Sequence, residues 1–513
     1  CKTKYKVEVI MNGKHNYKRS IVIALFAISL FLFLYLFFSV EHPLYVYDSD
    51  DWTYISYSRH IWPSVKNWNP TRILPEILMP LAAQFGVSVL MPFTGDYLGS
   101  MAYAFAAVLS IFIVFYILFF GKVVCNRFSL SEKESICLMV IIFLLSFLPF
   151  IKGSEKNEYL FYSGSVTNIF FYTIPALLNS ALVLYMLSSD NHSLLKDTHY
   201  LKTGGLILAI YLCINSNMFQ NIIISSYAAA HIIYEAILRF EERKFHKNTV
   251  LSFLYDNFDQ LIILCLWFIS LYFESQGGRA SQLGSSTDFN LQYALQSFVS
   301  SLNRLDHFYL FQLCCIVGAA VIAFGRYKKL QGQQANLRLE KNLIRLSGIS
   351  IIACIGTILY LVLLEAVTGA GYISRTDCMI SWMFWLFVIE VAALAYLIRI
   401  TPPLKRAIPL FILCLIFETF MYGNRYKDIS SYGEPEIIKQ IDDYIVQQVV
   451  IAERSGQNYV EVHIPLHNSF NWPLNTDWGG ERMALSLYRH GITDTIMDIV
   501  LIPDESINKR FHF

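Results

Sequence analysis

Apolar runs of about twenty residues recur along most of the chain, and they restrict its fold more than any other feature. The first run, residues 21–40, contains no charged side chain. A run of that length and character crosses the hydrocarbon core of a bilayer as an α-helix. Only 15% of all residues are charged, whereas soluble domains carry about 25%. The sequence therefore predicts an all-α polytopic membrane protein.

We predict eleven transmembrane helices, and their orientation follows from the basic residues between them. With the N-terminus in the cytoplasm, the cytoplasmic segments hold 24 Lys or Arg residues and the outer loops hold 8. This bias favours a cytoplasmic N-terminus and an outer C-terminus, which requires an odd number of helices. The predicted helices span residues 21–40, 98–120, 135–151, 166–187, 204–216, 218–238, 258–273, 308–325, 346–366, 379–398 and 407–422.

The apolar stretch 73–93 is left out of this count. It is interrupted by Pro75, Pro80 and Pro92, and a span at this place would reverse the charge bias of every later loop. We therefore expect an interfacial or re-entrant helix. The polar run 215–221 is interpreted as a turn between two short helices, and at membrane depth its polar groups must face a cavity or protein.

The chain divides into three predicted parts. Residues 1–20 form a basic cytoplasmic leader, in which Met11 is expected to be the natural start. Residues 21–422 form the membrane domain, which includes the long first outer loop 41–97. Residues 423–513 are polar and predict a small α/β domain on the outer side. Its expected elements are the helices 434–454 and 478–490 and the strands 459–466 and 495–502.

Charge and cysteine usage exclude some classes of function. The net charge of +1 gives no sign of nucleic-acid binding. The ten cysteines lack the spacing of a metal knuckle, and we expect no disulfide framework.

Three carboxylates follow the first apolar run closely, at Asp48, Asp50 and Asp51. Acids this near a membrane surface are costly unless they have a use. Neighbouring carboxylates repel one another, which raises a pKa and suits a general base. We predict Asp50 and Asp51 as catalytic residues and Asp48 as a supporting acid. No metal is predicted, and Mg²⁺ or Mn²⁺ held by Asp48 and Asp50 is the alternative. A hydrated loop with chance acids is the non-functional alternative.

Arginines in three separate outer loops are the predicted ligands of a phosphate group. Arg72, Arg279 and Arg375 lie near helix ends, and the planar guanidinium matches phosphate oxygens. Single arginines at such places often only contact lipid headgroups. Glu274 is interpreted as a second supporting acid or as the ion-pair partner of Arg279.

Four tryptophans on the outer side are candidates for binding a sugar acceptor, because aromatic rings stack on sugar rings. They are Trp52, Trp68, Trp472 and Trp478. Tryptophans also anchor segments at the membrane–water interface, which is the structural alternative.

The first outer loop resembles a known family in its residues. Asp50-Asp51-Trp52, then Trp68 and the run 71–76 (Thr-Arg-Ile-Leu-Pro-Glu) are similar to bacterial and phage-borne serotype-converting O-antigen glucosyltransferases. That group is part of the GT-C superfamily of polyprenyl-phosphate-sugar-dependent glycosyltransferases. The resemblance covers this loop by motif and the rest of the chain by architecture. Thr71 stands where the family pattern has Gly, so only Arg72 carries over.

The resemblance implies an inverting sugar transfer at the periplasmic face of the bacterial inner membrane. The donor would be a sugar, often glucose, on undecaprenyl phosphate. The acceptor would be O-antigen of lipopolysaccharide or another lipid-linked glycan, and one Asp of the pair would be the base. A small flippase and a donor-making glycosyltransferase on the cytoplasmic face are the implied partners.

Three other classes of protein stay open. An O-antigen polymerase or ligase has a similar number of spans, but it places its arginines in a late loop and has no early acid pair. A transporter or flippase of polysaccharide lipids buries paired charges near the bilayer midplane and often contains repeats. A scaffold protein without activity is the third.

Overall fold

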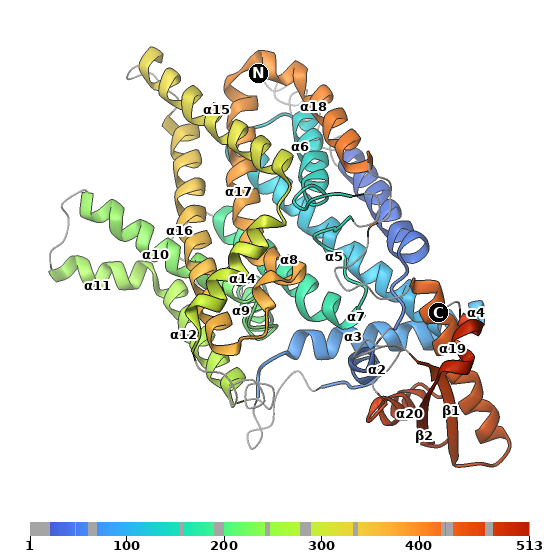
Figure 1. The fold of residues 1–513 in the computed structure, drawn as a ribbon. Helices are drawn as coiled ribbons and strands as arrows, with labels where there is room; N and C mark the ends of the chain where they lie inside the picture. Colours follow the sequence, from blue (N-terminus) through green and yellow to red (C-terminus); the bar gives the residue numbers. More distant parts are fainter. Residues whose placement is uncertain are drawn as a thin grey trace, which may run out of the picture.

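The computed structural model describes residues 21–46, 48–59, 69–153, 157–188, 200–241, 247–276, 289–331, 337–421, 426, 434–466 and 476–511. Within these ranges the chain is mostly helical, with one two-stranded sheet near the C-terminal end. Nine described helices are long and apolar enough to cross a membrane. The prediction of a helical, multi-pass membrane protein is therefore confirmed, and Figure 1 shows the arrangement of its helices.

The centre of the helical bundle is α17 (Thr376–Ile400), whose side chains are nearly all buried. It packs against α5 (Tyr97–Phe128), α15 (His307–Gln331) and α16 (Leu337–Thr368). The helix Val166–Ser188, which comprises α7, η3 and α8, is equally buried and packs on α5. Further helices are Ile21–Glu41, α6 (Glu132–Leu145), α9 (Tyr200–Ile214), α10 (Ile222–Glu241), α12 (Phe258–Ser275) and α18 (Pro402–Phe420).

The predicted count of eleven spans is not confirmed. Where we predicted spans at 135–151 and 204–216, α6 has 14 residues and α9 has 15, which is short for a full crossing. The 19-residue α18 carries Lys405, Arg406 and Glu418. Conversely, Ile73–Thr94 meets the length and apolarity of a span. Counting from hydropathy fails here because short helices can be covered by protein as well as by lipid.

The helix in the first outer loop, α3 (Ile73–Phe85), lies crosswise to the long helix α16 in Figure 1 and packs on α5. It continues through η2 (Gly86–Leu90) into α4 (Met91–Thr94). A Cβ on Gly86 would lie 2.8 Å from the Met101 Cα, so the η2 backbone rests directly on α5. The interfacial or re-entrant helix stays a prediction, because Ile73–Thr94 is also long and apolar enough to cross a membrane.

The C-terminal segment folds close to its predicted pattern. Helix α19 (Pro435–Arg454), β1 (Tyr459–Pro465), α20 (Gly479–Arg489) and β2 (Asp498–Asp504) follow in that order, and η6 (Glu505–Phe511) ends the described chain. The strands pair in parallel, with Tyr459 opposite Asp498. A Cβ on Gly480 would lie 2.1 Å from the Ile499 carbonyl oxygen, so α20 lies tightly on β2. Beside the first outer loop, α20 contacts the short helix α2 (Ser49–Tyr54).

Candidate functional site

A cavity of about 1120 Å³ opens at the end of the helical bundle where α2 lies. The segments that line it are predicted outer loops and the ends of the predicted helices next to those loops. These segments are α2 with Arg72, residues 162–172, the turn 217–219, the last turns of α12 and α16, α14 (Leu291–Asn303) and residues 372–377. The cavity thus brings together loops that are far apart in sequence.

Helix α2 carries the three acids, and each acid has a different setting. Asp48 caps the helix: its Oδ1 accepts a hydrogen bond from the Asp51 backbone N–H at 2.9 Å. Asp48 and Asp50 line the cavity, whereas Asp51 does not. Burial, and then the charge of Asp51, raise the pKa of Asp48 well above its usual range.

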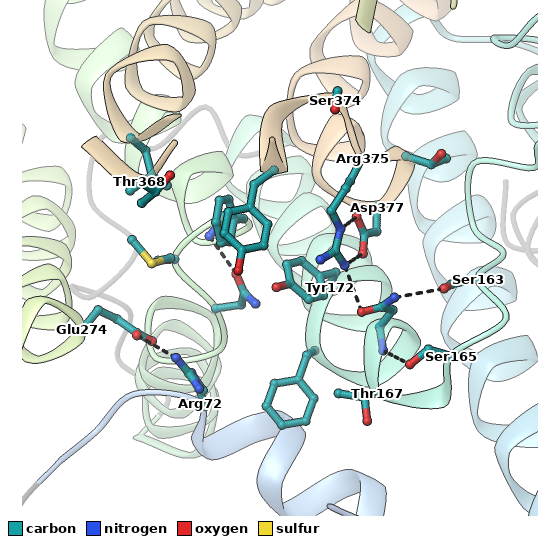
Figure 2. Close-up of a pocket in the computed structure, with 18 of the residues that line it drawn as sticks. Arg72, Ser163, Ser165, Thr167, Tyr172, Glu274, Thr368, Ser374, Arg375 and Asp377 are labelled. Carbon is teal, nitrogen blue, oxygen red and sulfur yellow. Dashed lines mark hydrogen bonds and ion pairs between the residues drawn. The ribbon is translucent and has the colours of Figure 1, made fainter. Parts of the chain in front are cut away.

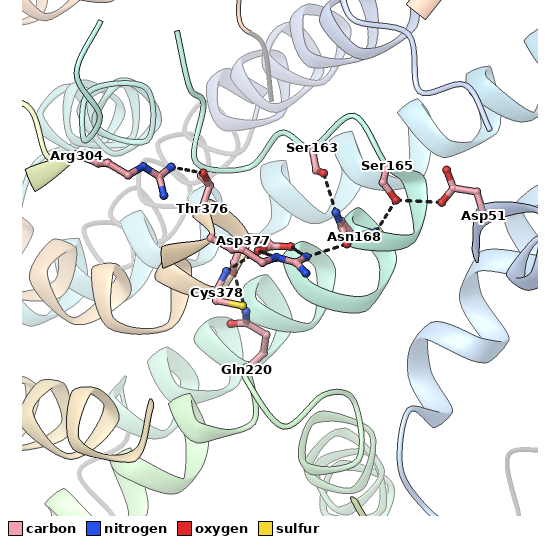
Figure 3. A network of polar contacts seen from close by, with 10 residues as sticks. Asp51, Ser163, Ser165, Asn168, Gln220, Arg304, Thr376, Asp377 and Cys378 are labelled. Carbon is pink, nitrogen blue, oxygen red and sulfur yellow. Dashed lines mark hydrogen bonds and ion pairs between the residues drawn. The ribbon is translucent and has the colours of Figure 1, made fainter. Parts of the chain in front are cut away.

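Asp51 is completely buried, and its carboxylate binds the first turn of the helix Val166–Ser188. Its Oδ1 accepts from the Thr167 N–H at 2.6 Å and from the Ser165 hydroxyl at 3.2 Å, and its Oδ2 accepts from the Val166 N–H at 3.3 Å. Figure 3 shows this contact at the edge of a wider polar network. A carboxylate at a helix N-terminus satisfies donors that otherwise have no partner. The geometry gives Asp51 a structural role and leaves Asp50 as the acid of the pair that faces the cavity.

Arg72 reaches the cavity from the N-terminal end of α3 and pairs with Glu274 at the end of α12. The Arg72 Nη2 and the Glu274 Oε2 are 3.2 Å apart (Figure 2). Arg72 has a left-handed backbone with φ of 58°, which is uncommon outside glycine and worth a functional hypothesis. Burial opposes the charge of Arg72, but Glu274 outweighs it and raises the pKa, so the guanidinium stays charged. We predicted Arg279 as the partner of Glu274; the structure pairs Glu274 with Arg72, and Arg279 lies outside the described residues.

Arg375 lies on the other side of the cavity from Arg72 (Figure 2). Its Nε and Nη2 hold both carboxylate oxygens of Asp377, at 3.1 and 2.5 Å. Nη2 also donates to the Asn168 side-chain oxygen at 2.9 Å, and the guanidinium lies 4.7 Å from the centre of the Tyr172 ring. The Asn168 amide in turn donates to the Ser163 hydroxyl. Arg375 is therefore held rigidly in place.

The site contains a third arginine that we did not predict. Arg304, at the end of α14, lines the cavity and binds the carboxylate of Glu158 and the backbone oxygen of Ser374. It also donates to the Thr376 hydroxyl at 2.8 Å, as Figure 3 shows. The sequence did give one signal for Arg304, because Arg279 and Arg304 are the only Lys or Arg residues in 274–307. Helix α14 was not predicted there, so Arg304 appeared to be a loop residue.

The tryptophans predicted to bind sugar do not line the cavity where they are described. Trp52 is fully buried and packs near Tyr97. Trp478 precedes α20 in the C-terminal domain. Trp68 and Trp472 lie outside the described residues. The described aromatic residues with a hydroxyl that line the cavity are Tyr54, Tyr162, Tyr172, Tyr360 and Tyr372.

No group of three His, Cys, Asp or Glu residues within the described ranges is arranged to hold a metal ion. Of the acids proposed for that role, Asp48 caps α2 through one oxygen. Carboxylates, arginines and hydroxyls are among the side chains that line the cavity.

Comparison of the chain with known protein families, curated proteins and solved structures finds no match.

Proposed function

We propose that the chain is an inverting membrane glycosyltransferase that takes a sugar from a polyprenyl-phosphate donor, with Asp50 as the general base. The observation that carries this proposal is the shared cavity, which Asp50 lines together with Arg72, Arg304 and Arg375. Of the other acids that line it, Asp48 caps α2, Glu274 pairs with Arg72 and Asp377 pairs with Arg375. Base and phosphate ligands on one cavity are what such a transfer requires.

The proposed step needs no metal. The acceptor hydroxyl attacks the anomeric carbon of the donor sugar while Asp50 takes the hydroxyl proton. The bond from that carbon to the phosphate oxygen breaks, and polyprenyl phosphate leaves with the electron pair. Arginines stabilise the charge that develops on the leaving phosphate. Direct attack from the opposite face inverts the configuration of the sugar.

Arg72 is the best-placed ligand for the leaving phosphate. Its pairing with Glu274 uses one guanidinium nitrogen, and a guanidinium has five N–H donors. Arg375 is engaged by Asp377 through two nitrogens. We therefore assign Arg375 mainly to the shape of the cavity and Arg72 to the donor phosphate.

An apolar opening beside Arg72 supports a lipid-linked donor. Leu271 of α12 and Leu363, Leu364 and Val367 of α16 line the cavity, and Leu363 is 54% exposed. Both helices pack on α10. Deeper in the bundle the gap is closed by Trp267 and Tyr360, whose ring centres are 5.4 Å apart. A polyprenyl chain would lie between the outer turns of α12 and α16 with its phosphate at Arg72.

The acceptor, by the same proposal, is a lipid-linked glycan such as O-antigen, and the cavity faces the periplasm. The loop resemblance and the positive-inside bias support both statements. The test compares the sugar composition of the surface polysaccharide in cells that carry the intact gene, Asp50→Asn, or the exposed control Asp498→Asn. We expect the added sugar with the intact gene and the control and a loss of 10²–10⁴-fold in transfer rate with Asp50→Asn. Unchanged transfer by Asp50→Asn would overturn the assignment.

An O-antigen polymerase or ligase is the second candidate. The late outer segments supply Arg304 and Arg375 to the same cavity, which is where that class places its arginines. A polymerase or ligase changes the length or attachment of the polysaccharide without adding a sugar type. The same composition experiment, read together with the chain-length distribution, therefore separates the two candidates.

A further inference from the structure

The short helix α2 is bound from outside by the C-terminal domain. The Ser486 hydroxyl of α20 donates to the Trp52 carbonyl at 2.5 Å, and Ser486 is completely buried. The hydroxyl of Ser56 lies 2.8 Å from that of Ser486. Ser486 is 434 positions from Trp52 and 430 from Ser56, so the contact joins the first outer loop to the C-terminal domain.

His490 adds a second connection between the same elements. Its Nε2 lies 3.3 Å from the carbonyl oxygen of Ile55, the residue after α2, and its Nδ1 lies 2.7 Å from the Tyr97 hydroxyl of α5. A carbonyl only accepts, so Nε2 carries the hydrogen and Nδ1 accepts from Tyr97. The neutral ring thus links α2 to α5.

The other side of α2 is fixed by Asp51, which binds the start of the helix Val166–Ser188. A helix of six residues is not stable alone. Its position is therefore set by these outside contacts, and they also fix where Asp50 enters the cavity.

We propose that Ser486 and His490 are positioning residues that hold Asp50 in the cavity through the Trp52 and Ile55 carbonyls, which makes the C-terminal domain a fixed support of α2 outside the cavity. This inference rests on the proposed sugar transfer. It gives the domain a role apart from the sugar binding predicted for Trp472 and Trp478.

Two substitutions of His490 test the inference, since each keeps one of its two contacts. The longer side chain in His490→Gln places its amide N–H where Nε2 was, facing Ile55. The shorter one in His490→Asn places its oxygen where Nδ1 was, facing Tyr97. We expect His490→Gln to keep kcat within about threefold. We expect His490→Asn to lower kcat at least tenfold with an unchanged KM for the donor, because small misplacements of a catalytic group are costly. Equal kcat values for both variants would overturn the inference.

A disulfide between Ser56→Cys and Ser486→Cys tests whether the C-terminal domain stays bound to α2 during turnover. Their hydroxyl oxygens are close enough for the two sulfurs to bond after a small shift. We expect the oxidised double variant to transfer sugar at the rate of its reduced form, with Ser56→Cys alone as the control. Loss of activity on oxidation that a reductant restores would show that the domain leaves α2 during turnover, which contradicts the inference.

The experiments distinguish a failure of the proposed sugar transfer from a failure of the positioning role of Ser486 and His490. If the intact protein transfers no sugar, the proposed function and this inference both fail. If the intact protein is active and Asp50→Asn is not, but His490→Asn equals the intact protein, only the positioning role fails.

Discussion

The Thr167 backbone N–H donates to the carboxylate of Asp51 at 2.6 Å, in a place that solvent does not reach. Asp50, its neighbour in sequence, lines the cavity. Consecutive positions on a helix point about 100° apart, so the two acids of one motif serve different purposes.

Asp51→Ala should therefore affect stability, and Asp50→Asn should affect catalysis. Removing the Asp51 carboxylate leaves the N–H groups of Val166 and Thr167 and the Ser165 hydroxyl without this acceptor. We expect a loss of about 1–3 kcal/mol, seen as a lower Tm of the detergent-solubilised protein. Asp50→Asn should keep the Tm within a degree or two and lose transfer. If Asp50→Asn lowered the Tm and Asp51→Ala left the Tm unchanged, the roles of the two acids would be the reverse of those assigned here.

Substituting Arg72 and Glu274 singly and together should separate an effect on folding from an effect on donor binding. Arg72→Gln leaves the buried Glu274 without this ion pair, which lowers the Tm, and adding Glu274→Gln should restore it. Transfer should not return, because the donor phosphate still lacks its guanidinium. We expect a donor KM raised about 10–100-fold in both variants. Recovery of KM together with Tm would limit the pair to a structural role.

Leu363→Trp should obstruct the apolar opening between α12 and α16. Leu363 lines the cavity, and Leu359, one turn earlier on α16, is exposed but does not line it. We expect Leu363→Trp to raise the KM for a long polyprenyl-phosphate donor about tenfold or more and to leave a short-chain donor unaffected. Leu359→Trp is the matched control and should behave like the intact protein with both donors. An equal effect on both donors would place the lipid chain elsewhere.

Acid should loosen the C-terminal domain from α2 through His490. Burial lowers the pKa of His490 to about 4, and the charge of nearby Arg489 acts in the same direction. The unfolded or undocked state therefore binds the proton more readily, so docking is fully stable above the ordinary pKa of about 6.5 and weakens as the pH falls toward 4. The full effect is on the order of 3 kcal/mol. Proteolysis of the domain should accelerate from pH 7 to pH 4.5 in the intact protein and much less in His490→Gln.

Asp442 in α19 should make the stability of the protein depend on pH in the opposite direction from His490. Burial, then Asp443 and Asp51, raise the pKa of Asp442 well above its usual range. Its Oδ2 has no hydrogen-bond partner among the residues that the structure describes. The folded state holds this proton more tightly, so the group costs stability as the pH rises. Asp442→Asn, which cannot ionise, should raise the Tm at pH 7.5 by the equivalent of about 1–3 kcal/mol. The gain should shrink toward pH 4, and Asp443→Asn is the control.

Local patterns predicted much of this fold. Apolar runs located the long helices, and the polar run 215–221 correctly predicted a turn between α9 and α10. The elements of the C-terminal domain also lie close to their predicted ranges. These features depend on neighbours in sequence, which a pattern records.

The parts of the site that the sequence did not predict depend on distant contacts. Asp51 is a structural acid because Thr167 faces it, and Glu274 pairs with Arg72 across 202 positions of sequence. Sequence proximity instead suggested Arg279. Trp52 resembled an exposed aromatic residue and is buried because α5 and α20 cover α2.

The contact between the Trp52 carbonyl and Ser486 also has a consequence in time. At about 5–20 residues per second, a ribosome makes Ser486 roughly 20–90 s after Trp52. Throughout that interval α2 lacks the hydroxyl that binds its last turn. Under the proposed function, Asp50 would therefore stay unaligned in the nascent membrane domain, and sugar transfer would begin only when synthesis has almost finished.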